Sequence, residues 1–435
     1  MNIKKSLKAL SSLWAGSIMA AFLAFLTQVM VARILGPSEY GVLSSALSAA
    51  TLIAPLAGFG IPQLWLKIFG VEGWAGIRWI PASFKFIKIS STLTIILLIT
   101  WALAIQHNTE TKIILFVLTF HVAHQLFTEI TSSKLQLEER YQLLSMIQII
   151  PHGLRLLGIS TMYLISPLSV DAITVSLIYA GVAIPTVIFG MIEMSKMKGR
   201  SFSLKGHPPQ NSSDCLSRPS LYKVFVDSLP FGMAATFHLV MFQINIILIS
   251  YIATPKEAGI YNVAFAIMTA VYLTPSVIYQ KFLLPKIHRW STHDRVRFVE
   301  VYKKGNLAML LLGISAMLCV LVFAPWAVPV LFGEKYLDAI PVLQILSICA
   351  PLRFLACSVG VTLVTQEHMK SKVYLMGVAA LFNTLASIVF IKHMNLTGAA
   401  IATVLSDLLL LSLYYFFAQK YVFGHTHNHS TEKLT

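Results

Sequence analysis

The sequence predicts an all-α polytopic membrane protein, with about twelve transmembrane helices in two six-helix lobes around a central cavity. Three observations indicate this fold class. Of the 435 residues, 56% are hydrophobic and only 12% are charged, which is a membrane composition rather than a soluble one. Apolar segments long enough to cross a bilayer recur along the whole chain. A motif beside the first of them returns in the second half.

The apolar segments divide evenly between the halves, given that a crossing helix needs roughly 20 apolar residues. In the first half they cover residues 13–34, 42–66, 86–106, 112–132, 142–165 and 171–193. In the second half they cover residues 225–252, 259–284, 306–332, 340–365, 372–392 and 397–419. The uncharged run from Ala9 to Ala32 is too long for a secretory signal, so the first helix is expected to stay uncleaved.

The repeated motif follows the first apolar segment of each half. Ala32–Ala46 reads ARILGPSEYGVLSSA, and Ala253–Ala264 reads ATPKEAGIYNVA. Pro37, Glu39, Gly41 and Ala46 return in register as Pro255, Glu257, Gly259 and Ala264. Because six crossings is an even number, both halves enter the membrane in the same direction, as parallel repeats typical of alternating-access carriers. We expect lobes at 1–194 and 224–420, a linker at 195–223 rich in Pro, Gly and Ser, and a tail at 421–435.

Positive charge is concentrated in alternate loops, including the linker and the loop after residue 284. This placement sets membrane orientation and predicts that both termini are cytoplasmic. The net charge of +15 is therefore explained without a nucleic-acid partner. Pro285–Lys304 is either an amphipathic helix facing anionic lipids or an ordinary basic loop.

Metal and cofactor signals are weak throughout. Four cysteines, Cys215, Cys319, Cys349 and Cys357, have no metal-ligand spacing. The alternate histidines of the tail, His425, His427 and His429, are those of a solvated terminus. We predict no metal and no cofactor.

Charged residues inside apolar segments cost at least about 2.5 kcal/mol each and must face protein or water. Arg155 and Arg353 interrupt the fifth and tenth segments. Arginine stays protonated and binds phosphate through two parallel hydrogen bonds, which favours a substrate role, with a structural pair to Asp407 or to a helix end as the alternative. Polar residues at helical spacing extend this set. The candidate substrate-binding residues are Arg33, Gln148, His152, Arg155, His238, Asn245, Asn262 and Arg353.

A second set of polar residues suits ion coupling, because buried carboxylates and imidazoles exchange protons. No ATP-binding signature is present, so we expect H⁺ or Na⁺ to drive any active transport. The candidates are Asp227, His121, His124 and Asp407. A neutral, hydrogen-bonded structural pair is the alternative for the two histidines.

Several stretches resemble one family along nearly the whole chain. They are ARILGPSEYGVLSSALSAATLIAPLAGFGIP at 32–62, LQLEERYQ at 135–142, PKEAGIYNVAFAI at 255–267, LFGEKYLDAIPVLQIL at 331–346 and LTGAAIATVLSD at 396–407. These stretches resemble the bacterial polysaccharide-biosynthesis flippases, the exporters of lipid-linked oligosaccharides of O-antigen type. The resemblance implies a fold shared with multidrug and toxic-compound antiporters and with peptidoglycan lipid flippases.

The resemblance further implies a substrate, an oligosaccharide on undecaprenyl diphosphate, moved between leaflets for O-antigen or other surface polysaccharide assembly. It implies contact with membrane lipids, a polymerase and a chain-length regulator. A cation-coupled multidrug antiporter is the alternative function. A membrane polysaccharide polymerase or glycosyltransferase is disfavoured, because no paired-carboxylate motif, HExxH, phosphate loop or nucleophile elbow is present. We therefore do not expect an enzyme.

Overall fold

The computed structural model describes residues 3–105, 107–199, 203–205, 217–276, 294–365 and 369–423, and within these ranges all regular structure is helical. Nine helical stretches of the described chain are long and apolar enough to cross a membrane. Trp14–Ala104 contains three crossings and Met369–Tyr421 contains two, so the described residues give the twelve predicted crossings. Cys215, residues 285–293 of the Pro285–Lys304 segment and the tail histidines lie outside the described residues.

The chain divides into two compact units, Met1–Leu239 and Val240–Thr435. The first contains α1 (Ile3–Gly58), α2 (Ile61–Glu72), the 3₁₀ turn Gly73–Trp79, α3 (Ile80–Ala104), α4 (Thr109–Val117), α5 (Thr119–Leu137), α6 (Tyr141–Ile165), α7 (Ala172–Lys198) and the start of α8 (Leu221–Ile252). The second contains the rest of α8, α9 (Pro255–Ser276), α11 (Arg295–Phe332), α12 (Ala339–Ser347), α13 (Cys349–Thr365) and α14 (Met369–Phe417). The lobe boundaries at 194 and 224 stay predictions.

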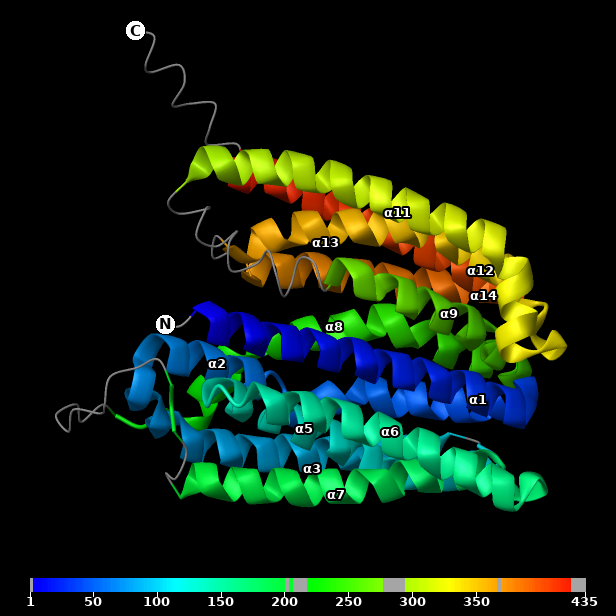
Figure 1. Cartoon of the computed structure of the whole chain (residues 1–435), viewed down its shortest axis with the longest axis horizontal. Helices are drawn as coiled ribbons and strands as arrows, with labels where there is room; N and C mark the ends of the chain where they lie inside the picture. Colours follow the sequence, from blue (N-terminus) through cyan, green and yellow to red (C-terminus); the bar gives the residue numbers. More distant parts are fainter. Residues whose placement is uncertain are drawn as a thin grey trace, which may run out of the picture. The chain divides into compact units, whose positions relative to one another are not determined.

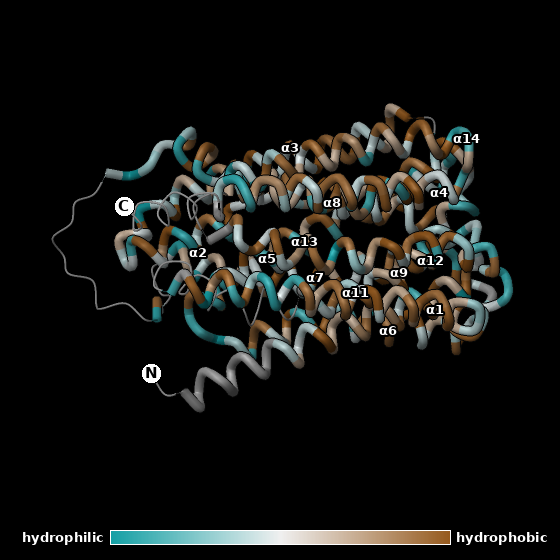
Figure 2. The backbone as a smooth tube through the Cα atoms, turned by 90° about the horizontal axis from the view of Figure 1, so that it is seen from above, coloured by the Kyte–Doolittle hydropathy of each residue, from teal (hydrophilic) through white to brown (hydrophobic). Residues whose placement is uncertain are grey.

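Small residues let the helices of the first unit pack closely. On α1, Ala32, Ala50 and Ala57 are fully buried, and α1 packs along α6, α3 and α5. Figure 1 shows these helices running lengthwise beside one another. Burial of apolar surface does not drive helix association inside a membrane. The van der Waals contacts that these small residues allow therefore hold the helices together. Large apolar side chains such as Leu93 and Ile96 are exposed on the outer face of α3, and Figure 2 shows hydrophobic residues along the helices with hydrophilic ones gathered toward their ends.

The two copies of the repeated motif both begin the second crossing of their half. In the first copy no loop is present: α1 is broken only at Gly36, whose φ of 72° is left-handed, and Pro37 starts the next helical segment. In the second copy α9 starts at Pro255, and Thr254 caps it. The Thr254 hydroxyl accepts a hydrogen bond from the Glu257 amide at 3.2 Å, which is an N-cap, and donates one to the Glu257 carboxylate at 3.0 Å.

The fourth crossing of each half is broken, which hydropathy did not predict. Leu118 separates α4 from α5, and Ile348 separates α12 from α13. Both break residues are apolar and lie in mainly apolar runs, each beside a single hydroxyl residue, so the segments 112–132 and 340–365 look continuous in sequence. The breaks matter because His121, His124 and Arg353 lie within the first two turns after them.

The turn between α1 and α2 is held against the start of α8 by two glycines. Gly60 has a φ of 79°, and a Cβ added there would lie 2.5 Å from the Gly232 nitrogen and 2.6 Å from the Ser228 oxygen. Phe59 stacks on Phe225 with ring centroids 6.0 Å apart. Backbone atoms cannot move aside as a flexible side chain can, so this contact requires glycine.

We expect Gly60→Ala to lower the melting temperature of the purified protein in detergent, because alanine in a left-handed conformation costs about 1–3 kcal/mol before the clash is added. Gly70→Ala is the matched control. Gly70 lies on an exposed face of α2 with nothing within 4 Å of an added Cβ, so alanine there should leave stability unchanged or raise it. Equal melting temperatures for the two variants would contradict the close contact.

Candidate functional site

The first unit holds a buried arginine with no acidic partner among its described residues. Arg155, on α6, is 4% exposed. Its guanidinium carbon lies 4.4 Å from the centre of the Tyr179 ring on α7. Its Nε and Nη2 atoms are buried without a hydrogen-bond partner in the described structure. One face of the guanidinium is therefore covered, and two edge donors remain unused.

Histidines surround this arginine. On α5, His121 and His124 are both buried, with ring centroids 6.0 Å apart, and His121 lies 6.2 Å from the Tyr179 ring. His152, three residues before Arg155 on α6, is partly buried. All three histidines are close enough to Arg155 to interact with it electrostatically. We call Arg155, Tyr179, His121, His124 and His152 the Arg155 cluster.

The Arg155 cluster carries a positive charge that the protein only partly compensates. A cation–π contact contributes about 0.5–2 kcal/mol. Removing an ion from water costs several kcal/mol even after relaxation. The stacking on Tyr179 is therefore too weak by itself to offset the burial of the guanidinium.

The second unit holds an arginine in a similar aromatic setting, but with its charge balanced. The Arg353 guanidinium, on α13, lies 4.2 Å from the Phe242 ring and 4.5 Å from the Tyr272 ring. Its Nε donates to Asp407 Oδ2 on α14 at 2.6 Å. Asp407 is 3% exposed. The structural pair left open as an alternative in the sequence is thus formed, while Nη1 of Arg353 keeps a buried donor without a partner in the described residues.

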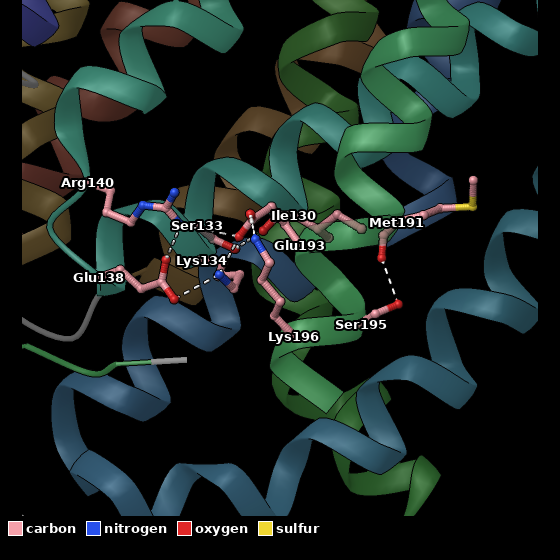
Figure 3. Close-up of polar contacts among 9 residues, drawn as sticks. All are labelled: Ile130, Ser133, Lys134, Glu138, Arg140, Met191, Glu193, Ser195 and Lys196. Atoms are coloured by element: carbon pink, nitrogen blue, oxygen red, sulfur yellow. Dashed lines mark hydrogen bonds and ion pairs between the residues drawn. The ribbon is translucent and has the colours of Figure 1, made fainter. Parts of the chain in front are cut away.

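A third charged group lies where α5, α6 and α7 meet, and Figure 3 shows it. Lys134 is fully buried and donates to Glu138 Oε1 at 2.8 Å and to Glu193 Oε2 at 2.6 Å. Arg140 donates to Glu138 Oε2 at 3.1 Å, and Lys196 donates to Glu193 Oε1 at 2.6 Å. We call these five residues the Lys134 network. It joins the α5–α6 turn to α7 and is closed by its own ion pairs, which makes it structural.

The other predicted residues of the first unit are dispersed. Arg33 is exposed on α1. Gln148 is on α6 and accepts a hydrogen bond from Ser17 of α1 at 3.2 Å. On α8, Asp227 in the second turn is partly buried and His238 near the middle of the helix is exposed. The structure therefore brings His121, His124, His152 and Arg155 together, while Gln148 binds a different helix.

The two predicted asparagines lie in the second unit. Asn245 is 3% exposed and belongs to a closed hydrogen-bond network. Its amide nitrogen donates to the Thr403 hydroxyl at 2.7 Å, and its oxygen accepts from the Ser387 hydroxyl at 2.7 Å. This arrangement fastens α8 to both halves of α14. Asn262 is partly buried on α9.

Sequence reasoning missed the aromatic and acidic partners. Tyr179, Tyr272 and Phe242 look like ordinary apolar residues of membrane helices, and only coordinates reveal that they stack on guanidinium groups. Lys134 was not among the predicted residues. Two features of the sequence could have indicated its ion pairs. Lys134 is spaced i,i+4 from Glu138, and Glu193 is the one acidic residue near the basic end of its helix.

Comparison with solved structures identifies the fold. The lipid II flippase MurJ, in an inward closed conformation, aligns with a TM-score of 0.72 at 12% identity, covering 94% of this chain and 87% of that chain. An inward-facing multidrug resistance MATE family transporter of the MOP superfamily aligns with a TM-score of 0.70 at 12% identity, covering 93% and 94% of the two chains. The chain shares the all-helical fold of these two structures, which confirms the predicted fold class.

Sequence comparison gives the family. The family model for polysaccharide biosynthesis proteins matches residues 6–290, which is more than half of the chain. The chain therefore belongs to the polysaccharide biosynthesis protein family, as the motif resemblance predicted. A relative from Klebsiella pneumoniae, described as an uncharacterized membrane protein in the cps region, is 24% identical over 98% of this chain and 84% of its own length.

Proposed function

We propose that the protein is a flippase that carries undecaprenyl-diphosphate-linked oligosaccharide repeat units from the cytoplasmic to the outer leaflet of a bacterial inner membrane, by alternating access of its two lobes. Family membership and the relative in a cps region support a role in surface polysaccharide assembly. Both termini would be cytoplasmic. A polymerase and a chain-length regulator are the partners expected of this function.

The observation that carries the substrate class is the unbalanced charge of the Arg155 cluster. A diphosphate cannot cross hydrocarbon unaided and needs cations or hydrogen-bond donors along its path. Arg155 offers unused donors in a geometry suited to phosphate, whereas the buried acid Asp407 is already paired. A carrier of organic cations would instead need an unpaired carboxylate deep in its interior, and Asp227, the other candidate acid, is only partly buried whereas Arg155 is 4% exposed. Charge therefore favours an anionic headgroup over a cationic drug.

The first test is a deletion strain in which lipid-linked repeat units are assayed in each leaflet. We expect them to accumulate on the inner leaflet, with loss of surface polysaccharide. Arg155→Ala should lower transport about tenfold or more, because a charge-assisted hydrogen bond contributes about 1.5–3 kcal/mol. Arg155→Lys should restore part of it. Lys112→Ala, at the start of α4, is the control and should transport normally.

Folded protein must be present for this comparison, so each variant is quantified by size-exclusion chromatography in detergent. Normal surface polysaccharide in the deletion strain, combined with raised accumulation of cationic drugs, would contradict the flippase and identify the antiporter. Transport by Arg155→Ala at the level of Lys112→Ala would remove Arg155 from the substrate path.

We also infer that an H⁺ or Na⁺ gradient drives the cycle, with the His121 and His124 pair as the candidate proton carrier of the first unit and Asp227 with His238 as the second candidate. The paired imidazoles of α5 support the first choice, because both Nδ1 atoms are buried without a partner in the described structure. We expect His121→Gln/His124→Gln to alter the pH dependence of flipping in proteoliposomes. A profile identical to that of the wild type would exclude this pair.

A further inference from the structure

The Arg155 cluster contains several buried polar atoms that the described protein leaves without partners. They come from two helices, with Nε and Nη2 of Arg155 on α6 and Nδ1 of His121 and of His124 on α5. Buried polar groups are nearly always hydrogen-bonded, and an exception calls for an explanation such as a bound ion or water. Their proximity makes one common ligand the simplest explanation.

The unpartnered atoms of this cluster include three that are hydrogen-bond donors. Guanidinium nitrogens have no acceptor capacity. Gln125 Nε2, an amide donor, lies 3.0 Å from His121 Nε2, so in the neutral ring Nε2 accepts and Nδ1 carries the hydrogen. A ligand that meets two guanidinium donors and an imidazole donor must be an acceptor. Water would satisfy the hydrogen bonds but leave the positive charge of Arg155 unbalanced.

The second unit supplies an internal comparison. Arg353 has the same aromatic stacking, and there the edge of the guanidinium is occupied by the carboxylate of Asp407. No carboxylate pairs with Arg155 in the described part of the chain. The group that Asp407 provides in one unit is therefore not supplied by the described residues in the other.

We propose that the Arg155 cluster is a binding site for a compact anion, either an ion free in the medium or the phosphate of a lipid headgroup, which serves as the counter-ion of Arg155. Tyr179 covers one face of the guanidinium and the anion lies at its edge, toward His121 and His124. The site stands without the proposed flippase function, and only the lipid source of the anion rests on that function.

Delipidated protein in detergent provides the test. Bromide or inorganic phosphate is titrated against gluconate at constant ionic strength, and the melting temperature is recorded. We expect a saturable rise for the wild type, because a ligand that binds only the folded state stabilises it. In Arg155→Met the rise should disappear, and in Arg155→Lys the apparent affinity should fall about tenfold. Lys88→Gln, which removes an exposed cation of the same unit, should keep the wild-type response.

Anomalous diffraction from bromide-containing crystals of the wild type keeps the proposal testable if Arg155→Met does not fold, and a peak beside Arg155 is expected. Polyprenyl diphosphate added to the bromide titration separates the two sources. If polyprenyl diphosphate weakens the response to bromide, the two compete and the site binds both the lipid phosphate and the free ion. If the response to bromide is unchanged, the site binds the free ion alone. A wild-type melting temperature insensitive to every anion, or bromide peaks only elsewhere, would overturn the site and leave the flippase proposal standing.

Discussion

Replacing Lys134 with methionine is expected to destabilise the first unit more than any other single change to its charged residues. Lys134 contacts both carboxylates of the Lys134 network and is fully buried. Without it, Glu138 and Glu193 keep only two partners that are themselves about half exposed. Breaking a buried ion pair costs about 3–5 kcal/mol, so the melting temperature in detergent should fall by roughly 10 °C.

Lys196→Met is the matched control, because it removes a cation from the same Glu193 carboxylate. The Lys196 side chain is 47% exposed, and such a pair contributes at most about 1 kcal/mol. Adding Glu138→Gln and Glu193→Gln to Lys134→Met should recover much of the loss, because no unpaired charge then remains buried. Similar losses in Lys134→Met and Lys196→Met would show that burial does not set the strength of this network.

Much of the fold could be predicted from sequence because hydropathy reports membrane crossings directly. The repeated motif lies at the start of the second crossing in each half, although these helices begin at Pro37 and Pro255, a few residues before the predicted starts at 42 and 259. Hydropathy failed where the chain changes direction without changing polarity. The breaks at Leu118 and Ile348 lie inside mainly apolar runs that contain no charged residue or proline next to the break, and α1 turns at Gly36 with no loop at all.

The candidate site was predictable by residue type but not by partner. An arginine inside an apolar segment is conspicuous, and the spacing of His121 and His124 on α5 correctly put both imidazoles on one buried face. Spacing along one helix cannot reveal what the next helix presents. Arg155 faces Tyr179 while Arg353 faces Asp407, and this difference, which decides whether charge is balanced, depends on packing between helices.

The pairing of Arg353 with Asp407 leads to the second large effect. Arg353→Met alone leaves a carboxylate that is 3% exposed without its cation, which should cost about 3–5 kcal/mol and deplete folded protein. Arg353→Met/Asp407→Leu removes both charges and fills the space with apolar atoms. Such replacements of buried pairs are often neutral or stabilising, so we expect the double variant to melt near the wild-type temperature.

Transport by the double variant then separates the two roles of Arg353. Because Asp407 already balances the guanidinium, we expect the folded double variant to keep transport, in contrast to Arg155→Ala. Asp407→Asn alone offers a further check, since it leaves Arg353 charged and unpaired between Phe242 and Tyr272. A double variant that is folded but inactive would instead show that Arg353 contacts the substrate through its remaining donor, Nη1.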